Sequence, residues 1–353
     1  MSKYGVAGVW LLLGMGLLSL SGCLSSCWRR PSFALLPSDS LSVRIAAQTP
    51  VSLLTLMWES RGDSSARFSV PRTVRFSPDG HLIYVADADK NQILVFNRQG
   101  EGVRVIQDRR LHWPFLSGWR QDSLVLYQPT AHQFVVLHAG DVKRVFPAPE
   151  GPFTYTAAED EWLYFKAVGE AFEGYITRLN ASGQPILPQV TLDGPFWRFV
   201  GPLDIEKNVL YSFRAYRPVV DRLFPDGRRD TLALIGFDSP QLARSKLFLE
   251  GEIDEPPLLI PSARVRDSLI FVLNTRPGWV RIDVYNRQGR LQHIFEPDSV
   301  GFESNFYPLD IDIFPAGEGI YEAAIVLIRP EPALRFYRLD SRRRLEGQKH
   351  KKF

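Results

Sequence analysis

Cysteine and histidine are scarce in this chain, and their positions exclude several kinds of site. The 353 residues contain two cysteines, Cys23 and Cys27, so the rest of the chain has neither a disulfide framework nor a zinc site built on cysteine. Of the six histidines, only His132 and His138 lie close in sequence, at opposite ends of one short segment. That arrangement does not predict an imidazole metal site.

Excess charge and catalytic motifs are also lacking. The formal net charge of +3 is too small to predict binding of nucleic acid. The chain has no glycine-rich nucleotide fingerprint, no Walker loop, no Gly-x-Ser-x-Gly and no His-Glu-x-x-His. We therefore assign no catalytic residue and favour a non-catalytic role over an enzymatic one.

Apolar residues, glycine and proline are plentiful. Hydrophobic residues make up 45% of the chain and charged residues 23%, which predicts a large core. The 26 glycines, 26 prolines and 12% aromatic residues favour a turn-rich all-β protein over a helical one.

The first 22 residues have the pattern of an export signal. Lys3 is followed by an apolar stretch over 6–20 that is too short for a comfortable membrane span. The stretch ends in Leu20-Ser21-Gly22-Cys23, which resembles the lipobox of bacterial lipoproteins. The resemblance implies cleavage before Cys23 and lipidation of its sulfur. An ordinary signal peptide is the alternative, and Cys27 in a repeat of the pattern is a second candidate for the lipid.

This resemblance also predicts where the protein resides. Acyl chains would anchor it to a membrane after export. Leu24 stands where inner-membrane lipoproteins of some bacteria carry aspartate, which favours the outer membrane, facing the periplasm or the cell surface. Residues 23–45 carry turn residues and no apolar period, so we expect a tether there, followed by one domain over 46–353.

An internal repeat dominates that domain. Residues 71–106 contain four short apolar segments separated by turns, among them Ser77-Pro78-Asp79-Gly80 and Asn97-Arg98-Gln99-Gly100, which predicts an antiparallel meander. The same order recurs after each of six leading prolines: Pro71, Pro114, Pro152, Pro195, Pro261 and Pro308. Their spacing is mostly near the length of one propeller blade, about 40 to 50 residues.

The sequence therefore predicts a six-bladed β-propeller with four-stranded antiparallel blades. The long fourth interval holds a loop-rich insertion, roughly 236–259, in which 241–250 is a short helix or an extra strand. We expect an N-terminal strand, either Ser42–Arg44 or Val51–Trp58, to complete the last blade and close the ring.

The first blade resembles the NHL-type repeat of six-bladed propellers. Pro78-Asp79-Gly80, Val85-Ala86-Asp87, Asn91 and Ile93 match that repeat, while Gln92 replaces its arginine. The whole chain is similar to bacterial lipoproteins with a six-bladed propeller of the NHL-like or TolB-like kind, as found in Bacteroidetes-type bacteria.

Two groups of residues are candidates for a site at the central channel. The first is an aromatic and cationic rim beside the leading prolines, suited to recognising a protein or a glycan: Trp113, Phe115, Phe153, Trp197, Arg198 and Tyr307. Core packing is the alternative role for each aromatic. The second is the pair Asp310 and Asp312, which share one face of a strand. They either bind a cation or form a latch with arginines of neighbouring blades, and we favour the latch.

Three functions follow from these expectations. The first is a lipid-anchored envelope module that binds a protein or glycan partner without catalysis and without a cofactor. The alternative is a metal-dependent hydrolase or lactonase, with calcium or a similar divalent cation held by the channel carboxylates. The third is a structural envelope component that docks a neighbour through the 236–259 insertion. The identity of the ligand and the oligomeric state stay open here.

Overall fold

The computed structural model describes residues 39–62, 67–151, 153–168, 173–302 and 305–344. The expected signal and lipidation sites Cys23 and Cys27, and the leading Pro152, lie outside these ranges. Strands form most of the described residues, as the all-β prediction required. Within the described ranges, no helix is both long and apolar enough to cross a membrane.

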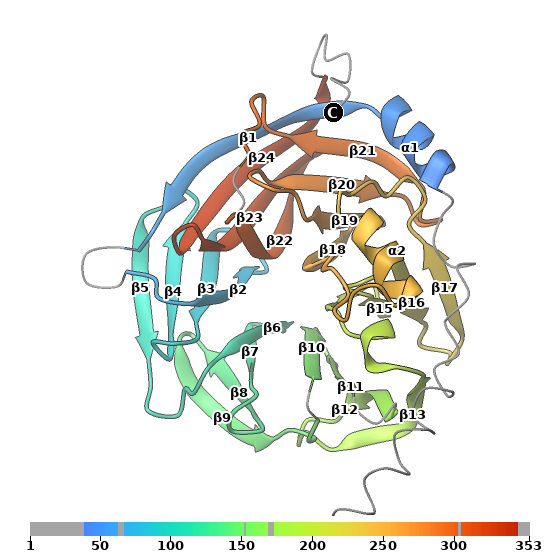
Figure 1. The fold of residues 1–353 in the computed structure, drawn as a ribbon. Coiled ribbons are helices and arrows are strands. Elements are labelled where there is room, and N and C mark those ends of the chain that lie inside the picture. The colour runs from blue at the N-terminus through green and yellow to red at the C-terminus, as the bar shows by residue number, and fades with distance from the viewer. Residues whose placement is uncertain (1–38, 63–66, 152, 169–172, 303–304, 345–353) are drawn as a thin grey trace, which may run out of the picture.

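Consecutive strands form antiparallel units arranged in a ring, of four strands each except the last, which has three consecutive strands (Figure 1). The first two units are β2 (Pro71–Phe76), β3 (Leu82–Asp87), β4 (Gln92–Asn97) and β5 (Gly102–Gln107), then β6 (Phe115–Arg120), β7 (Ser123–Gln128), β8 (Gln133–His138) and β9 (Asp141–Pro147). The next two are β10 (Phe153–Glu159), β11 (Trp162–Val168), β12 (Glu173–Leu179) and β13 (Pro185–Asp193), then β14 (Leu203–Glu206), β15 (Val209–Phe213), β16 (Val219–Leu223) and β17 (Arg229–Ala233). The last are β18 (Ser262–Arg266), β19 (Leu269–Asn274), β20 (Arg281–Tyr285) and β21 (Leu291–Glu296), then β22 (Tyr307–Gly317), β23 (Ile320–Arg329) and β24 (Ala333–Arg344).

The first strand of each unit lies nearest the centre of the ring (Figure 1). These inner strands contact one another in the order β2, β6, β10, β14, β18, β22 and back to β2. Between β6 and β10 the contact becomes parallel pairing, with Ala158 opposite Gly118 and Glu159 opposite Trp119. The inner strands therefore line a common centre with side chains from every unit.

β1 (Val51–Ser60) completes the unit of β22–β24 by antiparallel pairing with β24, and its first residues pair in parallel with β21. The Trp58 ring stacks on Phe336 at 5.1 Å, and its indole nitrogen donates a hydrogen bond to the carbonyl of Arg98 at 2.8 Å. Gly100, at φ +86°, permits this docking because a Cβ there would lie 2.7 Å from the Trp58 ring. Of the two segments expected to close the ring, the structure uses Val51–Trp58.

The other segment, Ser42–Arg44, belongs to helix α1 (Asp39–Gln48). The described end of the expected tether is therefore helical and packed, not extended. Ala46 is buried and Ile45 half-buried against the core cluster of the β14–β21 region. Burial of these two side chains holds α1 on the ring, which the weak apolar period of the segment did not predict.

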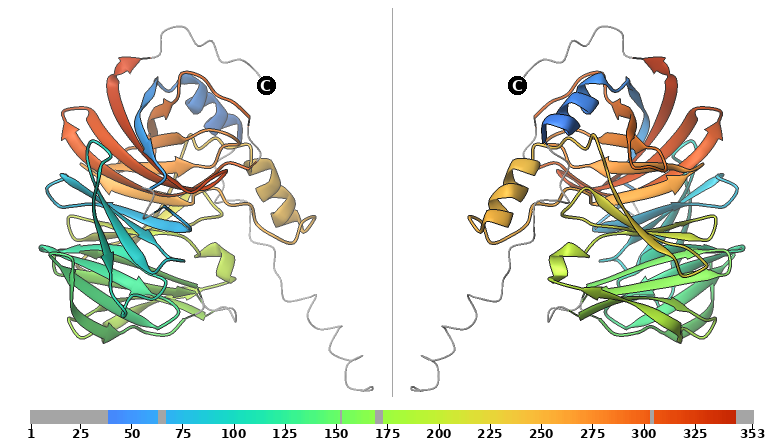
Figure 2. Two further views of the ribbon diagram at one scale, coloured as in Figure 1. Left: turned by 90° about the vertical axis from the view of Figure 1, so that its left-hand side faces the viewer. Right: turned by 90° about the vertical axis from the view of Figure 1, so that its right-hand side faces the viewer.

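The 236–259 insertion contains helix α2 (Leu242–Glu250), so the helical alternative for 241–250 is correct. α2 projects from one face of the ring (Figure 2). Phe248 of α2 contacts the Trp197 ring edge to face at 5.1 Å. The insertion therefore covers the start of the β14–β17 unit.

The prediction that Pro195 leads into the inner strand of that unit is wrong. Pro195 precedes a 3-10 turn, η2 (Phe196–Arg198), and the inner strand β14 begins only at Leu203, after Pro202. Gly201 lies just before this strand with φ +143°. A Cβ at this position would lie 2.5 Å from the carbonyl oxygen of Phe213, so the backbone here requires glycine. Arg198 is consequently on η2 and not on an inner strand.

Apolar faces of neighbouring units pack together to form the core. One cluster joins Val74 and Phe76 of β2 to Ala324 and Val326 of β23, where the first and last units meet. Each sheet thus buries a face that it cannot bury alone.

Candidate functional site

Two cavities open at the centre of the ring, one at each end of the inner strands. The front cavity, of about 200 Å³, lies where the inner strands begin, and its lining includes Arg72, Phe115, Thr154, Leu203 and Leu309. The rear cavity, of about 320 Å³, lies where they end. Arg75 borders both cavities, so the two are separated by the side chains around it.

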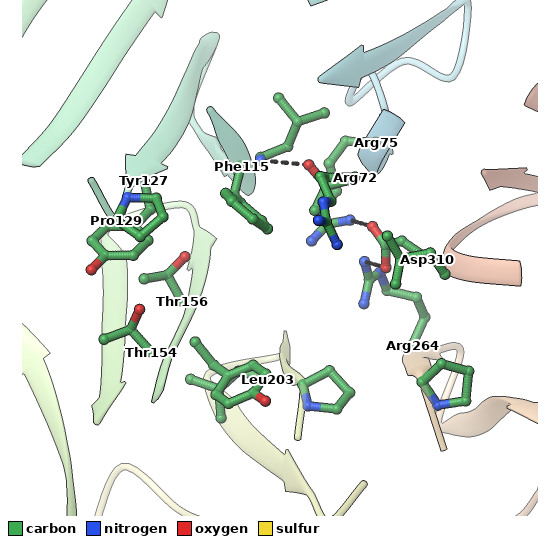
Figure 3. A pocket seen from close by; sticks show the side chains of 16 residues that line it. Arg72, Arg75, Phe115, Tyr127, Pro129, Thr154, Thr156, Leu203, Arg264 and Asp310 are labelled. Atoms are coloured by element: carbon green, nitrogen blue, oxygen red, sulfur yellow. Dashed lines mark hydrogen bonds and ion pairs between the residues drawn. The ribbon is translucent and has the colours of Figure 1, made fainter. Parts of the chain in front are cut away.

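Asp310 lies between Arg75 and Arg264 at this place (Figure 3). One carboxylate oxygen accepts hydrogen bonds from the Val74 backbone at 3.0 Å and the Arg75 guanidinium at 2.7 Å. The other accepts from Arg264 at 2.9 Å and from the Ser262 hydroxyl. A single carboxylate of β22 thus joins its two neighbours in the ring, β2 and β18.

Asp312 repeats the arrangement one step along β22. It accepts from the Phe76 backbone at 2.8 Å and from Arg264 and Arg266, both at 3.2 Å. Arg266 in turn reaches Asp204 of β14 at 3.0 Å. The ion pairs therefore run across four consecutive inner strands, from β2 through β22 and β18 to β14.

The charges in this network compensate one another. Burial raises the pKa of Asp310, but Arg264 and Arg75 outweigh burial and hold that pKa below its usual value. A divalent cation at this point would have to displace guanidinium groups that already bond the carboxylate oxygens. Among the residues that the structure describes, no three His, Cys, Asp or Glu side chains converge as a metal site.

Three of the rim candidates lie in the front cavity or near its Arg72. Phe115 lines it directly. The Arg72 guanidinium lies 5.9 Å from the centre of the Trp113 ring, and Arg72 Nε is buried without a hydrogen-bond partner among the described residues. Burial raises the pKa of Tyr307, while Arg72 and Arg329 lower it, so Tyr307 lies near the same cation. Phe115 thus shares the cavity wall with Arg72, and Trp113 and Tyr307 lie near Arg72.

The other three rim candidates lie elsewhere. Phe153 stacks on Phe196 with ring centres 5.4 Å apart, and it is partly exposed. Trp197 is only 4% exposed and lies against Phe248 of α2, which fits the core-packing alternative at this position. Arg198 is half-buried on η2, and neither it nor Trp197 lines either cavity.

Comparisons with known proteins bear on the fold. No protein-family model matches the sequence, and no curated protein matches it either. A solved structure of selenomethionine-substituted virginiamycin B lyase from Staphylococcus aureus is similar, with a TM-score of 0.51, 11% identity, and coverage of 79% of this chain and 88% of the lyase. A catalytically inactive variant of that lyase with quinupristin also has a TM-score of 0.51 and 11% identity, over 79% of this chain and 99% of the lyase.

Virginiamycin B lyase is a seven-bladed β-propeller. The present chain is a β-propeller. At 11% identity the likeness extends to the fold and no further. The expected kinship with NHL-like lipoproteins stays a prediction.

The propeller brings residues to the front cavity that the sequence did not single out. Tyr127, Thr154 and Thr156 lie along one side, opposite the arginines and Asp310 (Figure 3). Alternation along β10 was the available signal, since residues two apart share a face. Their hydroxyl groups add hydrogen-bonding capacity to a mostly apolar wall.

Behind this wall lies Lys166, a fully buried lysine on β11. Its ammonium nitrogen donates to the Phe199 carbonyl at 3.0 Å and the Ser212 hydroxyl at 3.1 Å, and lies 4.8 Å from the centre of the Tyr155 ring. Burial lowers the pKa of Lys166 to about 7. A single lysine inside the apolar run Trp162–Val168 was the only signal in the sequence.

The rear cavity of the propeller has a different character. Burial and then the negative charge of Asp204 raise the pKa of Glu159 to about 7, against the opposing effect of Arg266. The rear lining includes four acidic residues, Glu159, Asp160, Asp204 and Asp312, whereas the front lining includes Asp310.

Proposed function

We propose that this protein is a lipid-anchored module of the bacterial cell envelope that binds a protein or glycan partner at the front cavity, without catalysis. We also propose that its propeller has six four-stranded blades, the last completed by β1. The lipobox-like segment ending at Cys23 supports the membrane anchor, at the outer membrane facing the periplasm or the cell surface.

The front cavity carries the binding proposal. Its walls combine Phe115, Tyr127 and Leu203 with hydroxyl groups, and Arg72 Nε has no hydrogen-bond partner within the described ranges. An unpaired buried donor gains free energy when a ligand supplies an acceptor. The volume of about 200 Å³ is below the range of about 300–1,000 Å³ typical of pockets for whole small molecules. We therefore expect it to take one side chain or one sugar residue of a larger partner.

The metal-dependent alternative gains no support from the channel carboxylates. Both oxygens of Asp310 and both of Asp312 accept hydrogen bonds from backbone or arginine groups. These bonds suit a latch between inner strands.

The test is a binding screen of the full chain in a nonionic detergent, against an array of bacterial envelope glycans and a displayed peptide library. We expect Arg72→Ala to weaken the selected binder at least tenfold, about 1.4 kcal/mol, because the acceptor on the ligand loses its partner. Affinity is measured by calorimetry.

Arg120→Ala is the matched control, since Arg120 ends β6 at the opposite face and donates to the carbonyls of Asp160 and Glu161. It should change the affinity less than twofold. The proposal fails if the screen yields no binder, or if both variants affect binding equally.

A further inference from the structure

Arg217 is a buried cation whose guanidinium group finds no hydrogen-bond acceptor within the described residues. It follows β15 in the turn before β16, and its side chain is 1% exposed. All three guanidinium nitrogens lack a hydrogen-bond partner among the described residues. Buried arginines are normally paired, because an isolated buried charge is costly. Such a group is therefore expected to have a ligand.

Two further arginines surround Arg217. Arg214 precedes it in the same turn, where the Arg217 backbone N–H donates to the Arg214 carbonyl at 3.3 Å. Arg198 approaches from η2, because the chain after η2 is held against this turn by a hydrogen bond from Ala215 to the Val200 carbonyl at 2.7 Å. Burial, Arg214 and Arg198 together lower the pKa of Arg217 to about 10. The three guanidinium groups are thus close enough to repel one another.

The negative charge nearby does not balance them. Asp221 is bonded by Arg214 through both of its oxygens, at 2.9 and 2.8 Å, and also accepts from the Thr231 hydroxyl. Arg198 Nε is buried and has no hydrogen-bond partner within the described part of the chain. Apart from the Arg214–Asp221 pair, no carboxylate of the described residues accepts a hydrogen bond from Arg198 or Arg217.

We propose that Arg198 and Arg217, beside the Arg214–Asp221 pair, form a binding site for an oxyanion: a phosphate, a sulfate or a carboxylate group. Guanidinium groups match the geometry of such oxygens and bind them with charge-assisted hydrogen bonds. The site lies outside the front cavity and does not depend on the function proposed for it. Because Arg217 is buried, the site takes a small ion or the terminal group of a larger molecule.

The experiment measures thermal unfolding of the full chain in a nonionic detergent as a function of added anion. Inorganic sulfate, inorganic phosphate and glucuronate are the three probes, each compared with chloride at matched ionic strength. A preference for sulfate or phosphate identifies a tetrahedral ion, and a preference for glucuronate identifies a sugar carboxylate. We expect at least one probe to raise the unfolding temperature in a saturable way.

Variants separate this site from general salt effects. Arg217→Met and Arg198→Met should each weaken the apparent affinity for the effective anion at least tenfold. Without anion, Arg217→Met should unfold at a higher temperature than the wild type, since it removes an unpaired buried charge. Arg229→Met, which removes an exposed arginine of the same unit, should leave the anion response unchanged.

Two results would overturn the proposal. One is that no probe stabilises the wild type more than chloride does. The other is that the anion raises the unfolding temperature of Arg217→Met and Arg198→Met as much as that of the wild type. The stabilisation would then come from exclusion of the salt from the protein surface and not from binding at these arginines.

Discussion

Two buried cations, Lys166 and Arg217, have unusual surroundings for charged side chains. Lys166 donates to two neutral oxygens and no carboxylate accepts from it among the described residues, and Arg217 lacks even neutral acceptors. Desolvation is the largest cause of the lowered pKa of both groups. The two residues respond differently: lysine can lose its proton near neutral pH, whereas arginine keeps its charge and needs a counter-ion.

Lys166 predicts how the stability of the protein depends on pH. Its pKa is about 7 in the folded protein and about 10.4 in an unfolded chain, so the unfolded state binds more protons between these values. The free energy of unfolding therefore rises with pH, by about 1.4 kcal/mol per unit from this group. Between pH 8 and 9.5, the wild type should gain about 2 kcal/mol relative to Lys166→Met in urea denaturation.

Lys143→Met is the control for this measurement, because Lys143 is exposed on β9. It should follow the wild type at every pH. Parallel pH profiles for the wild type and Lys166→Met would show that Lys166 keeps its proton when buried.

At the scale of elements, carboxylates hold the inner strands together where sheet hydrogen bonds do not. Asp310 accepts from the backbone of Val74, and Asp312 from that of Phe76, residues that lie 236 positions away. Asp204 does the same for Val265 of the next unit, at 2.6 Å. Each carboxylate thus accepts from a backbone N–H of a neighbouring strand and from at least one arginine of an inner strand.

Asp310→Asn should therefore be strongly destabilising. The substitution keeps the shape of the side chain but removes the carboxylate that Arg75 bonds, and it leaves the buried Arg264 with Asp312 as its remaining bonded carboxylate. We expect a loss of about 3–5 kcal/mol in the free energy of unfolding. Asp226→Asn, in an exposed turn beside Arg228, should cost less than about 0.5 kcal/mol. A loss below about 1 kcal/mol for Asp310→Asn would contradict a latch.

For the whole molecule, β1 links the start of the chain to its end. It covers the edge of β24 and touches β21, so it protects backbone groups that would otherwise be open to pairing with another chain. Leu54, almost fully buried in the cluster between β19–β21 and β22–β24, adds apolar contacts to this closure.

Removing residues 1–60 tests this closure. We expect the shortened chain to aggregate, or to exchange the backbone amides of β24 that face β1 at least tenfold faster in hydrogen exchange. A synthetic peptide of residues 51–60 should restore protection. A chain that begins at Asp39 keeps both α1 and β1 and is the control. Unchanged exchange in the chain lacking β1 would show that the ring is stable while open.

Much of the strand plan could be predicted because its signals are local. Asn97 and Asn286 begin the two Asn-Arg-Gln-Gly turns, and each side-chain oxygen accepts backbone hydrogen bonds from two and four residues ahead at 2.9–3.0 Å. The same four residues therefore give the same turn wherever they occur. The error at Pro195 arose because a leading proline marks the end of a loop but not the distance to the next strand.

The sequence by itself determined the all-β class, the repeated four-strand plan and most strand positions, since period and turn chemistry act over a few residues. Only the tertiary structure decided which segment closes the ring, that α1 packs on it, that α2 covers Trp197, and which arginines Asp310 and Asp312 bind. It also left Arg217 without a hydrogen bond to Asp221, the carboxylate that Arg214 binds. These outcomes depend on contacts between residues far apart in the chain, whose positions are fixed only when the sheets pack against one another.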